Sequence, residues 1–253
     1  MQLFDLSGKT AIVTGGNQGI GFGIARGLGK AGATVIIANR RVEEGRKAAA
    51  SLTSEGVKAE AIQTDVSSRS SVTALADKVI RDYGQIDILV NNAALIVRKP
   101  VEETTDDDWD YVMDTNLKGT FICCQVVGQH MIERKKGKII NISSMVAQVT
   151  QPLRGVYAVS KAGISHLTRA FAAEWAKHNV HVNAIGPGPT ITPFNKKYLE
   201  EHPDDLQAMV SGIPLGRMGD PVDYAGVAVL LASEASDFIT GQTILADGGL
   251  TLW

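Results

Sequence analysis

The chain has few cysteines and no long apolar run, and each of these absences excludes a class of protein. Its 253 residues include only two cysteines, Cys123 and Cys124, which are adjacent in a helix-like segment and cannot easily bridge each other. No apolar stretch is long enough to cross a bilayer, and the amino terminus lacks a basic segment followed by an apolar run. We therefore expect a soluble cytoplasmic protein without structural disulfides.

An excess of charge of one sign is also absent. Lys and Arg total 25 against 27 Asp and Glu, a formal net charge of −2. Without a basic field or a polybasic anchor, neither nucleic acid nor a membrane surface is expected as a partner. The five histidines are scattered, and His178 and His181 lack suitable carboxylate or cysteine neighbours, so no metal site is predicted.

The chain does contain a regular alternation of strand and helix patterns. Short β-branched runs, typical of strands buried on both faces, occur at residues 10–13, 34–38, 86–90, 138–142 and 180–185, with weaker ones at 58–63 and 243–245. Helical patterns cover residues 20–31, 42–54, 68–83, 106–134, 156–178 and 221–232. This order predicts a three-layer α/β fold, a Rossmann-type doubly wound parallel sheet in which residues 1–253 form a single domain.

Two segments interrupt this alternation. Pro187-Gly188-Pro189 ends a strand and leads into a polar stretch, so residues 189–213 are predicted to form a mobile lid over a site. Residues 250–253 are apolar although they end the chain. They are expected either to dock on another subunit or to pack within their own, and the sequence favours neither.

A glycine-rich turn with GxxxGxG spacing joins the first strand to the first helix. Backbone amides in such a turn can cradle a pyrophosphate beside the helix N-terminus, and the glycines allow a close approach. The alternative is that the glycines serve only a tight turn. The dinucleotide interpretation assigns contacts to Gly15, Asn17, Gln18, Gly19, Ile20 and Gly21.

The end of the second strand indicates which dinucleotide is held. Rossmann proteins that bind NAD commonly have an acidic residue about 20 residues past the glycines, whereas this chain has Asn39, Arg40 and Arg41. Without a carboxylate to repel it, and with guanidinium groups to bind it, the 2′-phosphate of NADP(H) is favoured. The alternative is that both arginines only solvate a helix start, although cations there oppose the helix dipole.

Tyr157 and Lys161 stand one helical turn apart, thirteen and seventeen residues after Ser144. Side chains at i and i+4 share a helix face, so the ammonium of Lys161 is expected to favour the ionised form of the Tyr157 phenol. A phenol that ordinarily titrates at about 10 could then exchange a proton near neutral pH. Together with the dinucleotide turn, the pair predicts a nicotinamide-dependent enzyme that interconverts carbonyls and alcohols.

The complete motif set resembles one family over essentially the whole chain. The turn TGxxxGIG, Asp65-Val66, Asn91-Asn92-Ala93, Asn116, Ser144, Tyr157/Lys161 and Pro187-Gly188 occur in the order of the short-chain dehydrogenases/reductases. The family's usual NNAG has Ala94 in place of glycine, which affects only local backbone geometry.

The resemblance implies roles for four catalytic residues. Tyr157 would be the general acid/base, and Lys161 would acidify it and bind the nicotinamide ribose. Ser144 would hold the substrate carbonyl, with Ser143 as its adjacent rival, and Asn116 would support a water that relays protons through Lys161. Further cofactor contacts are implied for Asp65, Val66, Asn91, Ala93, Pro187, Gly188, Thr190 and Thr192, besides Tyr157 and Lys161.

The substrate is indicated by Arg98 and Arg154, which lie where members of the family often line the pocket beside Ser144 and Tyr157. Guanidinium groups there suit a carboxylate or a polyhydroxylated group. The segment 97–100 is also similar to that of gluconate 5-dehydrogenases and deoxygluconate dehydrogenases. The first hypothesis is therefore an NADP(H)-dependent oxidoreductase of a small-molecule keto sugar acid, sugar or polyol, assembled as a homotetramer as the family usually is.

Two alternatives stay open. A 3-oxoacyl-[acyl-carrier-protein] reductase would favour a basic groove near the site, for which Arg134-Lys135-Lys136 is the only obvious cluster. A non-catalytic NADP-sensing scaffold belongs to another class, since a fold does not fix a function. The complete set of Asn116, Ser144, Tyr157 and Lys161 argues against the scaffold.

Overall fold

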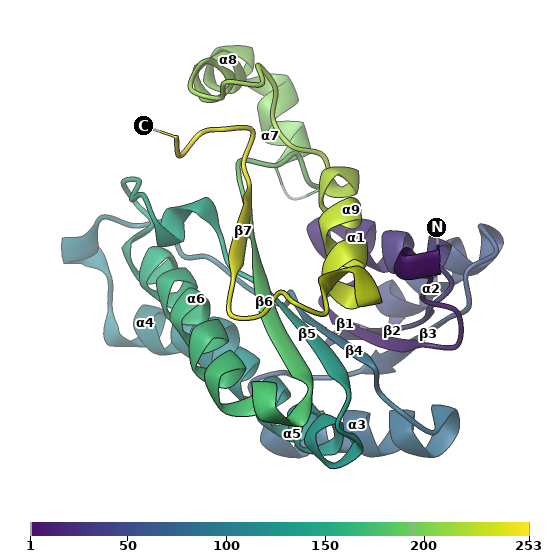
Figure 1. The fold of residues 1–253 in the computed structure, drawn as a ribbon. Helices are drawn as coiled ribbons and strands as arrows, with labels where there is room; N and C mark the ends of the chain where they lie inside the picture. The colour runs from purple at the N-terminus through teal and green to yellow at the C-terminus, as the bar shows by residue number, and fades with distance from the viewer. Residues whose placement is uncertain (1, 194, 253) are drawn as a thin grey trace.

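The computed structural model describes residues 2–193 and 195–252. It shows a parallel sheet covered by helices on both faces (Figure 1). Within these residues the strand order is β3-β2-β1-β4-β5-β6-β7, and every neighbouring pair is parallel. The predicted doubly wound α/β fold is therefore confirmed. The strands are β1 (Thr10–Thr14), β2 (Thr34–Asn39), β3 (Ala59–Gln63), β4 (Ile88–Asn91), β5 (Gly137–Ile142), β6 (Val180–Pro187) and β7 (Thr243–Ala246).

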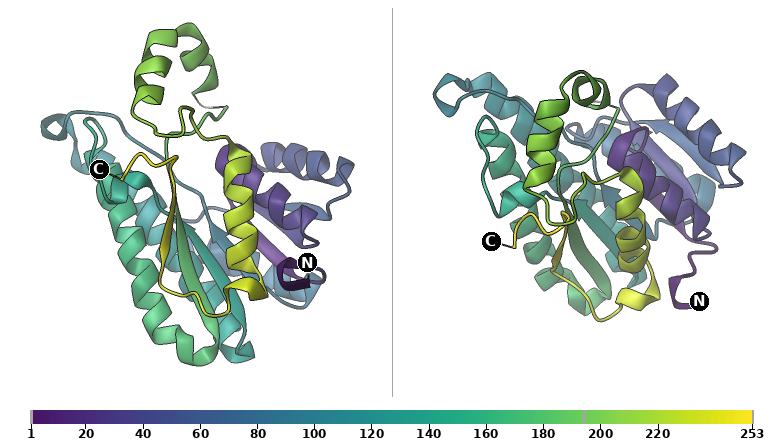
Figure 2. Two further views of the ribbon diagram at one scale, coloured as in Figure 1. Left: turned by 45° about the horizontal axis from the view of Figure 1, so that its top comes forward. Right: turned by 90° about the horizontal axis from the view of Figure 1, so that it is seen from above.

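Two helical layers cover the sheet (Figure 2). One layer packs α1 (Gly19–Lys30), α2 (Val42–Ser54) and α9 (Ala225–Ala232) on one face. The other packs α3 (Arg69–Tyr83), α5 (Gly119–Arg134) and α6 (Gly155–Trp175) on the opposite face. The remaining helices are α4 (Asp106–Met113), α7 (Lys196–Glu201) and α8 (Pro203–Ser211), and the short turns of 3-10 helix are η1 (Gln2–Phe4), η2 (Val101–Glu103), η4 (Met145–Ala147), η5 (Ala176–His178), η6 (Pro221–Tyr224) and η7 (Glu234–Ser236).

Strand side chains alternate between the two layers, which explains the continuous apolar runs in the sequence. On β1, Ala11 and Val13 belong to the core under α1, whereas Ile12 belongs to the core under α3. On β2, Val35 faces the first of these cores and Ile36 the second. Because successive strand side chains point to opposite faces, a sheet buried on both sides requires apolar residues at every position.

The single helix predicted over residues 106–134 is interrupted in the structure. A π-helical turn, η3 (Asp114–Lys118), separates α4 from α5, and its widened backbone contains Asn116. Turns of this kind insert one extra residue into a helix and occur frequently at functional sites. The difference from prediction arises because hydrophobic periodicity does not register a one-residue insertion.

The carboxyl ends of the strands meet at one edge of the sheet. Strands β1 to β3 are added toward one side of the sheet and strands β4 to β7 toward the other, so the order of the strands switches between β1 and β4. Ligands of doubly wound folds bind at such a switch point. Above this edge stand α7 and α8, within the predicted lid 189–213, of which Phe194 lies outside the described residues (Figure 2). An isolated bridge joins Thr190, near the start of this segment, to Gly219, which lies beyond its end.

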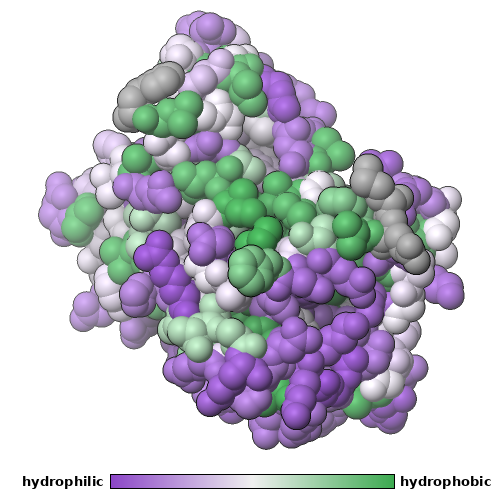
Figure 3. Space-filling model, in the orientation of Figure 1, coloured by the Kyte–Doolittle hydropathy of each residue, from purple (hydrophilic) through white to green (hydrophobic). Residues whose placement is uncertain are grey.

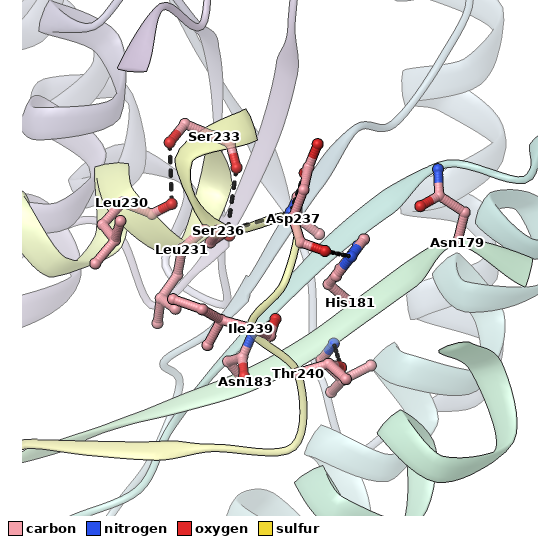
Figure 4. A network of polar contacts seen from close by, with 12 residues as sticks. Asn179, His181, Asn183, Leu230, Leu231, Ser233, Ser236, Asp237, Ile239 and Thr240 are labelled. Carbon is pink, nitrogen blue, oxygen red and sulfur yellow. Dashed lines mark hydrogen bonds and ion pairs between the residues drawn. The ribbon is translucent and has the colours of Figure 1, made fainter. Parts of the chain in front are cut away.

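The opposite, amino edge of the sheet is closed by a polar network (Figure 4). The Nε2 atom of His181 lies 2.9 Å from the backbone oxygen of Asp237, and the amide of Asn183 donates to the Ile239 carbonyl at 2.9 Å. Burial lowers the pKa of His181. These contacts fasten η7 to the start of β6. In the part of the chain that the structure describes, no three metal-ligating side chains gather, and no helix is long and apolar enough to cross a membrane.

Candidate active site

Ser144, Tyr157 and Lys161 come together at the carboxyl end of β5. Ser144 caps η4, which follows this strand, and the other two lie one turn apart at the start of α6. The Nζ atom of Lys161 is 5.5 Å from the centroid of the Tyr157 ring and donates to the Ile142 carbonyl at 2.7 Å. Lys161 is only 2% exposed. The structure thus gathers the buried Ser144 hydroxyl and Lys161 amine beside the partly buried Tyr157 phenol.

The protonation of this group differs from the sequence expectation. Burial raises the pKa of Tyr157, and it outweighs the Ser144 hydrogen bond and the charges of Arg154 and Arg98, all of which lower it. Burial also lowers the pKa of Lys161 to about 7. The expected acidification of Tyr157 by Lys161 is therefore not seen, because the amine loses much of its own charge in this environment.

Ser143 and Ser144 have different surroundings. The Ser143 hydroxyl donates to the Lys161 carbonyl at 3.0 Å and lies 2.7 Å from the Ser165 hydroxyl. By contrast, the Ser144 oxygen accepts a long 3.3 Å bond from the Val146 amide and interacts with the Tyr157 phenol. Only Ser144 is therefore free to direct its hydroxyl toward a substrate oxygen beside the phenol.

Asn116 connects the loop after β4 to the helix that carries Tyr157. Its amide group exchanges two 2.9 Å hydrogen bonds with the backbone of Leu95 and donates to the Ser160 hydroxyl at 3.1 Å. That hydroxyl in turn donates to the Tyr157 carbonyl at 2.7 Å. The structure thus gives Asn116 a positioning role, and the water relay implied by the resemblance stays a prediction.

The glycine-rich turn is tightly shaped at the start of α1. Gly15 and Gly19 have φ values of +63° and +55°, which side chains rarely adopt, and a Cβ at Gly21 would lie 2.4 Å from the Asn92 amide nitrogen. The helix starts after Gln18 with no side-chain cap, so its first amide groups are available to an anion. This turn suits a pyrophosphate, and a larger residue at these glycines would strain the backbone or collide with Asn92.

Asn92 locks this turn, a role that the sequence reasoning did not assign. Its amide donates to the carbonyls of Thr14 and Gly15 at 3.0 and 3.1 Å. The Thr14 hydroxyl accepts from the backbone of Asn92 and Ala93 at 3.0 and 3.1 Å. The repeated asparagine of the motif was the available signal, but it did not reveal which side chain faces the turn.

Asn91, the first residue of that motif, faces the other way. Its buried amide donates to the Asn141 oxygen at 2.9 Å and to the Cys124 sulfur at 3.2 Å, inside the core. Only the backbone of Asn91 is left to line a cofactor pocket. Cys124 and Cys123 are buried free thiols whose pKa values are raised by burial.

Asn39, which ends β2, and the two arginines that follow it have different surroundings. Asn39 is buried and donates to the Arg41 carbonyl at 2.6 Å. Arg40 is exposed, and its charge contributes to lowering the pKa of Asp65. Arg41 forms a 2.9 Å ion pair with Glu44, which also accepts from Asn17 at 3.2 Å. Glu44, not foreseen from the sequence, therefore competes for one of the two guanidinium groups.

The other predicted cofactor residues border the same edge. Val66 is buried against Gly119, and the Asp65 carboxylate accepts hydrogen bonds from Ser67. At the end of β6, a Cβ at Gly188 would meet Asp247 at 2.6 Å, which shows how closely the backbones approach after Pro187. The Thr190 hydroxyl bonds to the Gly188 carbonyl and to Tyr224, and the Thr190 carbonyl accepts from Asn195 at 2.9 Å. The Thr192 methyl lies 3.4 Å from an ideal Cβ on Gly19.

Arg98 and Arg154 form a positive rim at the phenol end of the site. Arg154, half-buried, precedes the first turn of α6, and burial together with the charge of Arg98 lowers its pKa. Both charges act on Tyr157. The pKa of Tyr198 on α7 is raised, chiefly by its hydrogen bond to Asp205, and the charge of Arg98 opposes this rise. Across residues 2–193 and 195–252, neither guanidinium has a carboxylate within ion-pairing distance.

The parallel sheet, the glycine cradle and the buried Ser, Tyr and Lys define a dinucleotide-binding oxidoreductase of the Rossmann class. Residues 15–251 match the family model described as enoyl-(acyl carrier protein) reductase. The chain belongs to the short-chain dehydrogenase/reductase family, and the resemblance seen in its sequence is confirmed.

Particular relatives are similar over the whole chain. The 2-dehydro-3-deoxy-D-gluconate 5-dehydrogenase of Formosa agariphila is 40% identical over 252 residues, which cover 99% of this chain and 95% of that protein. The 3beta-hydroxysteroid dehydrogenase 1 of Eggerthella lenta is 39% identical over 251 residues, with coverages of 98% and 96%. A crystal structure of gluconate 5-dehydrogenase from Burkholderia cenocepacia in complex with NADP and tartrate superposes with a TM-score of 0.93 at 38% identity, with coverages of 100% and 98%. Proteins of equal similarity thus act on different substrates, so the substrate must be argued from the site.

Proposed function

We propose that the protein is an NADP(H)-dependent oxidoreductase that interconverts a keto sugar acid, or a related sugar or polyol, and its secondary alcohol by hydride transfer. The observation that carries this proposal is the pair of guanidinium groups of Arg98 and Arg154, which have no carboxylate partner among the described residues and whose charges act on the partly buried Tyr157 phenol. Two such cations favour a substrate that brings a carboxylate.

The chemistry follows from the protonation states of the site. Because the pKa of Tyr157 is raised, the phenol holds its proton at neutral pH and can give it to a carbonyl oxygen during reduction. Ser144 donates a hydrogen bond to the same oxygen as negative charge develops on it. NADPH, when bound in the glycine cradle, supplies the hydride to the carbon. In the oxidative direction Tyr157 takes the proton back from the alcohol.

The 2′-phosphate of the cofactor is assigned to the end of β2. Arg40 is exposed and free to bind it, and no acidic residue ends the strand. Arg41 would join it by leaving Glu44, since their exposed ion pair is weak. The NADP bound to the Burkholderia cenocepacia relative supports this choice over NAD(H).

A carboxylate-bearing substrate is favoured over the alternatives. Tartrate, present with the same relative, is a hydroxylated dicarboxylate. For an acyl carrier protein, the predicted basic cluster lies at the wrong place. Arg134 bonds to the Ile86 carbonyl at 3.0 Å and to Asp87 at 3.1 Å, before the start of β4 and therefore at the amino edge of the sheet.

The assembly and the lid complete the proposal. A homotetramer in the cytoplasm is proposed, supported by exposed apolar side chains on the helices of one layer, among them Phe121 at 36% and Val159 at 47% exposure. Residues 189–213 are proposed to act as the lid, supported by the position of α7 and α8 above the carboxyl edge.

Oxidation of NADPH and NADH over a substrate panel tests the proposal. The panel contains 5-keto-D-gluconate, its neutral methyl ester, a 3-keto steroid and a 3-oxoacyl thioester. We expect the highest kcat/KM with the free acid and NADPH. Equal rates with NADH would overturn the cofactor assignment, and turnover of the thioester or the steroid alone would overturn the substrate class. A non-catalytic sensor would turn over none of them while still binding NADPH.

A further inference from the structure

The lid and the catalytic helix do not share one apolar core, and the tail of the chain lies where they meet. Met145, Val146 and Ala158 form a small cluster against which Tyr157 packs, here called the catalytic wall. Leu199, Ile213 and Met218 form a second one, here called the lid cluster. Leu250 is the partly buried side chain that packs against both.

The backbone around Leu250 is held firmly. The Asp247 carboxylate accepts from the Gly249 amide at 2.9 Å, and from the amide and hydroxyl of Thr251 at 3.0 and 2.7 Å. Gly248 and Gly249 have φ values of +68° and +88°, so this turn requires residues without a side chain. Leu250 is therefore carried by a rigid turn and not by a loose chain end.

The same turn is joined to the lid where the lid returns to the fold. The Leu215 amide donates to the Gly248 carbonyl at 3.1 Å, and a Cβ at Gly248 would meet Ile213 at 2.6 Å. An ideal Cβ on Gly212, directly after α8, would lie 3.5 Å from Leu250. Figure 3 shows hydrophobic residues gathered on this face, beside and below the lid helices. A movement of the lid must therefore move Leu250 or separate it from the lid cluster.

We propose that Leu250 is a specificity-determining residue that couples the lid to the catalytic wall and limits the bulk of the substrate held over Tyr157. This inference rests on the carbonyl/alcohol chemistry of the proposed function. A substrate whose oxygen reaches Tyr157 under the lid lies between the two clusters that Leu250 joins. The size of this side chain then sets the space that remains when the lid is closed.

For Leu250, the structure shows the second of the two arrangements expected for residues 250–253, because this side chain packs within its own subunit. Leu252 is 73% exposed, and Trp253 lies outside the described residues. Leu252 is thus a matched control, since it is the same residue type in the same tail without contact to either cluster.

Amide hydrogen exchange on NADPH-bound protein tests the coupling without any substrate. Leu250→Ala should speed exchange in α8 and in η4 together, because both lose the side chain that joins them. Leu252→Ala should change neither. Unchanged exchange in Leu250→Ala, or faster exchange in only one of the two segments, would overturn the coupling.

Turnover of two neutral ketones, cyclohexanone and the bicyclic decalone, tests the specificity. Leu250→Ala should raise the decalone-to-cyclohexanone ratio of kcat/KM about tenfold or more, since removing methylene groups from a pocket changes discrimination on that scale. Leu250→Phe should lower it, and Leu252→Ala should leave it unchanged. A ratio that moves equally in Leu250→Ala and Leu252→Ala would overturn the proposal. If the wild-type protein did not turn over keto sugar acids, the proposed function would be wrong, but the change in this ratio would still test the role of Leu250.

Discussion

The amino and carboxyl edges of the sheet both carry cationic side chains, but these cations serve different purposes. At the amino edge, Arg134 is paired with Asp87 at 3.1 Å and Lys138 with Asp237 at 2.7 Å, so each cation has its carboxylate. At the carboxyl edge, the charges of Arg98 and Arg154 act on Tyr157, and neither group has a carboxylate partner in the part of the chain that the structure describes. Paired charge fixes the chain in place, whereas unpaired charge beside a buried titratable group is available to a ligand.

The largest change in activity is expected for a substitution of Tyr157, and it tests whether the carboxyl edge is the active site. Tyr157→Phe should lower kcat by about a hundredfold to ten-thousandfold, because the proton donor is lost while the ring still packs. Tyr83→Phe is the matched control, since Tyr83 donates to Glu60 at 2.6 Å far from the carboxyl edge. Steady-state kinetics of both variants would contradict the account if they lost activity equally.

Arg154, at the carboxyl edge, is expected to affect substrate preference, whereas Arg134, which pairs with Asp87, is expected to affect the free energy of unfolding. Arg154→Met is expected to lower kcat/KM for the keto sugar acid by about tenfold to a hundredfold, with little change for a neutral ketone. Arg134→Met should leave kcat/KM unchanged and lower the free energy of unfolding by about 1–3 kcal/mol, because Asp87 remains buried without its cation. If Arg154→Met kept the same ratio of kcat/KM for the keto sugar acid to that for the neutral ketone, Arg154 would not bind the carboxylate.

A smaller effect is expected at the cofactor. Arg40→Ala should raise KM for NADPH by about tenfold and leave KM for NADH unchanged, because only the 2′-phosphate contact is lost. Arg46→Ala on α2 is the control, since its guanidinium already pairs with Glu43 at 2.6 Å. Equal changes for the two cofactors in Arg40→Ala would place the phosphate elsewhere.

The effect on stability is small at each step of pH. The folded-state pKa of Lys161 is lowered from 10.5 to about 7, so between these values the unfolded chain binds a proton that the folded chain does not. Stability relative to Lys161→Met should therefore rise with pH from about 7 to 10, by on the order of 1 kcal/mol per pH unit. Denaturant unfolding of cofactor-free protein at several pH values measures this, and a flat difference would place the amine in contact with water.

Much of the fold and site could be predicted because the relevant signals are local. The β-branched runs fixed the strands, and the spacing of Tyr157 and Lys161 on one helix predicted their proximity, which the structure reports as 5.5 Å from ring to amine. The direction of a side chain depends instead on tertiary contacts. For that reason the sequence did not show that Asn91 turns into the core or that Arg134 lies at the amino edge.

The burial of side chains and the irregularities of the backbone could likewise not be predicted from the sequence. The pKa of Tyr157 was expected to fall because a neighbouring amine is visible in the sequence, whereas the desolvation that raises it is not. The π-helical turn at Asn116 inserts a residue without changing the apolar pattern. The contacts of Leu250 with two clusters depend on a turn that is bonded to Leu215, a residue distant in the sequence.

The central claim is that unpaired guanidinium groups at the phenol select an anionic substrate. The most direct measurement is the ratio of kcat/KM for 5-keto-D-gluconate to that for its methyl ester, with wild-type enzyme and NADPH. The account predicts that the acid is preferred by about tenfold or more and that added salt reduces this preference. An ester that reacts as well as the acid, at low and at high salt, would contradict it.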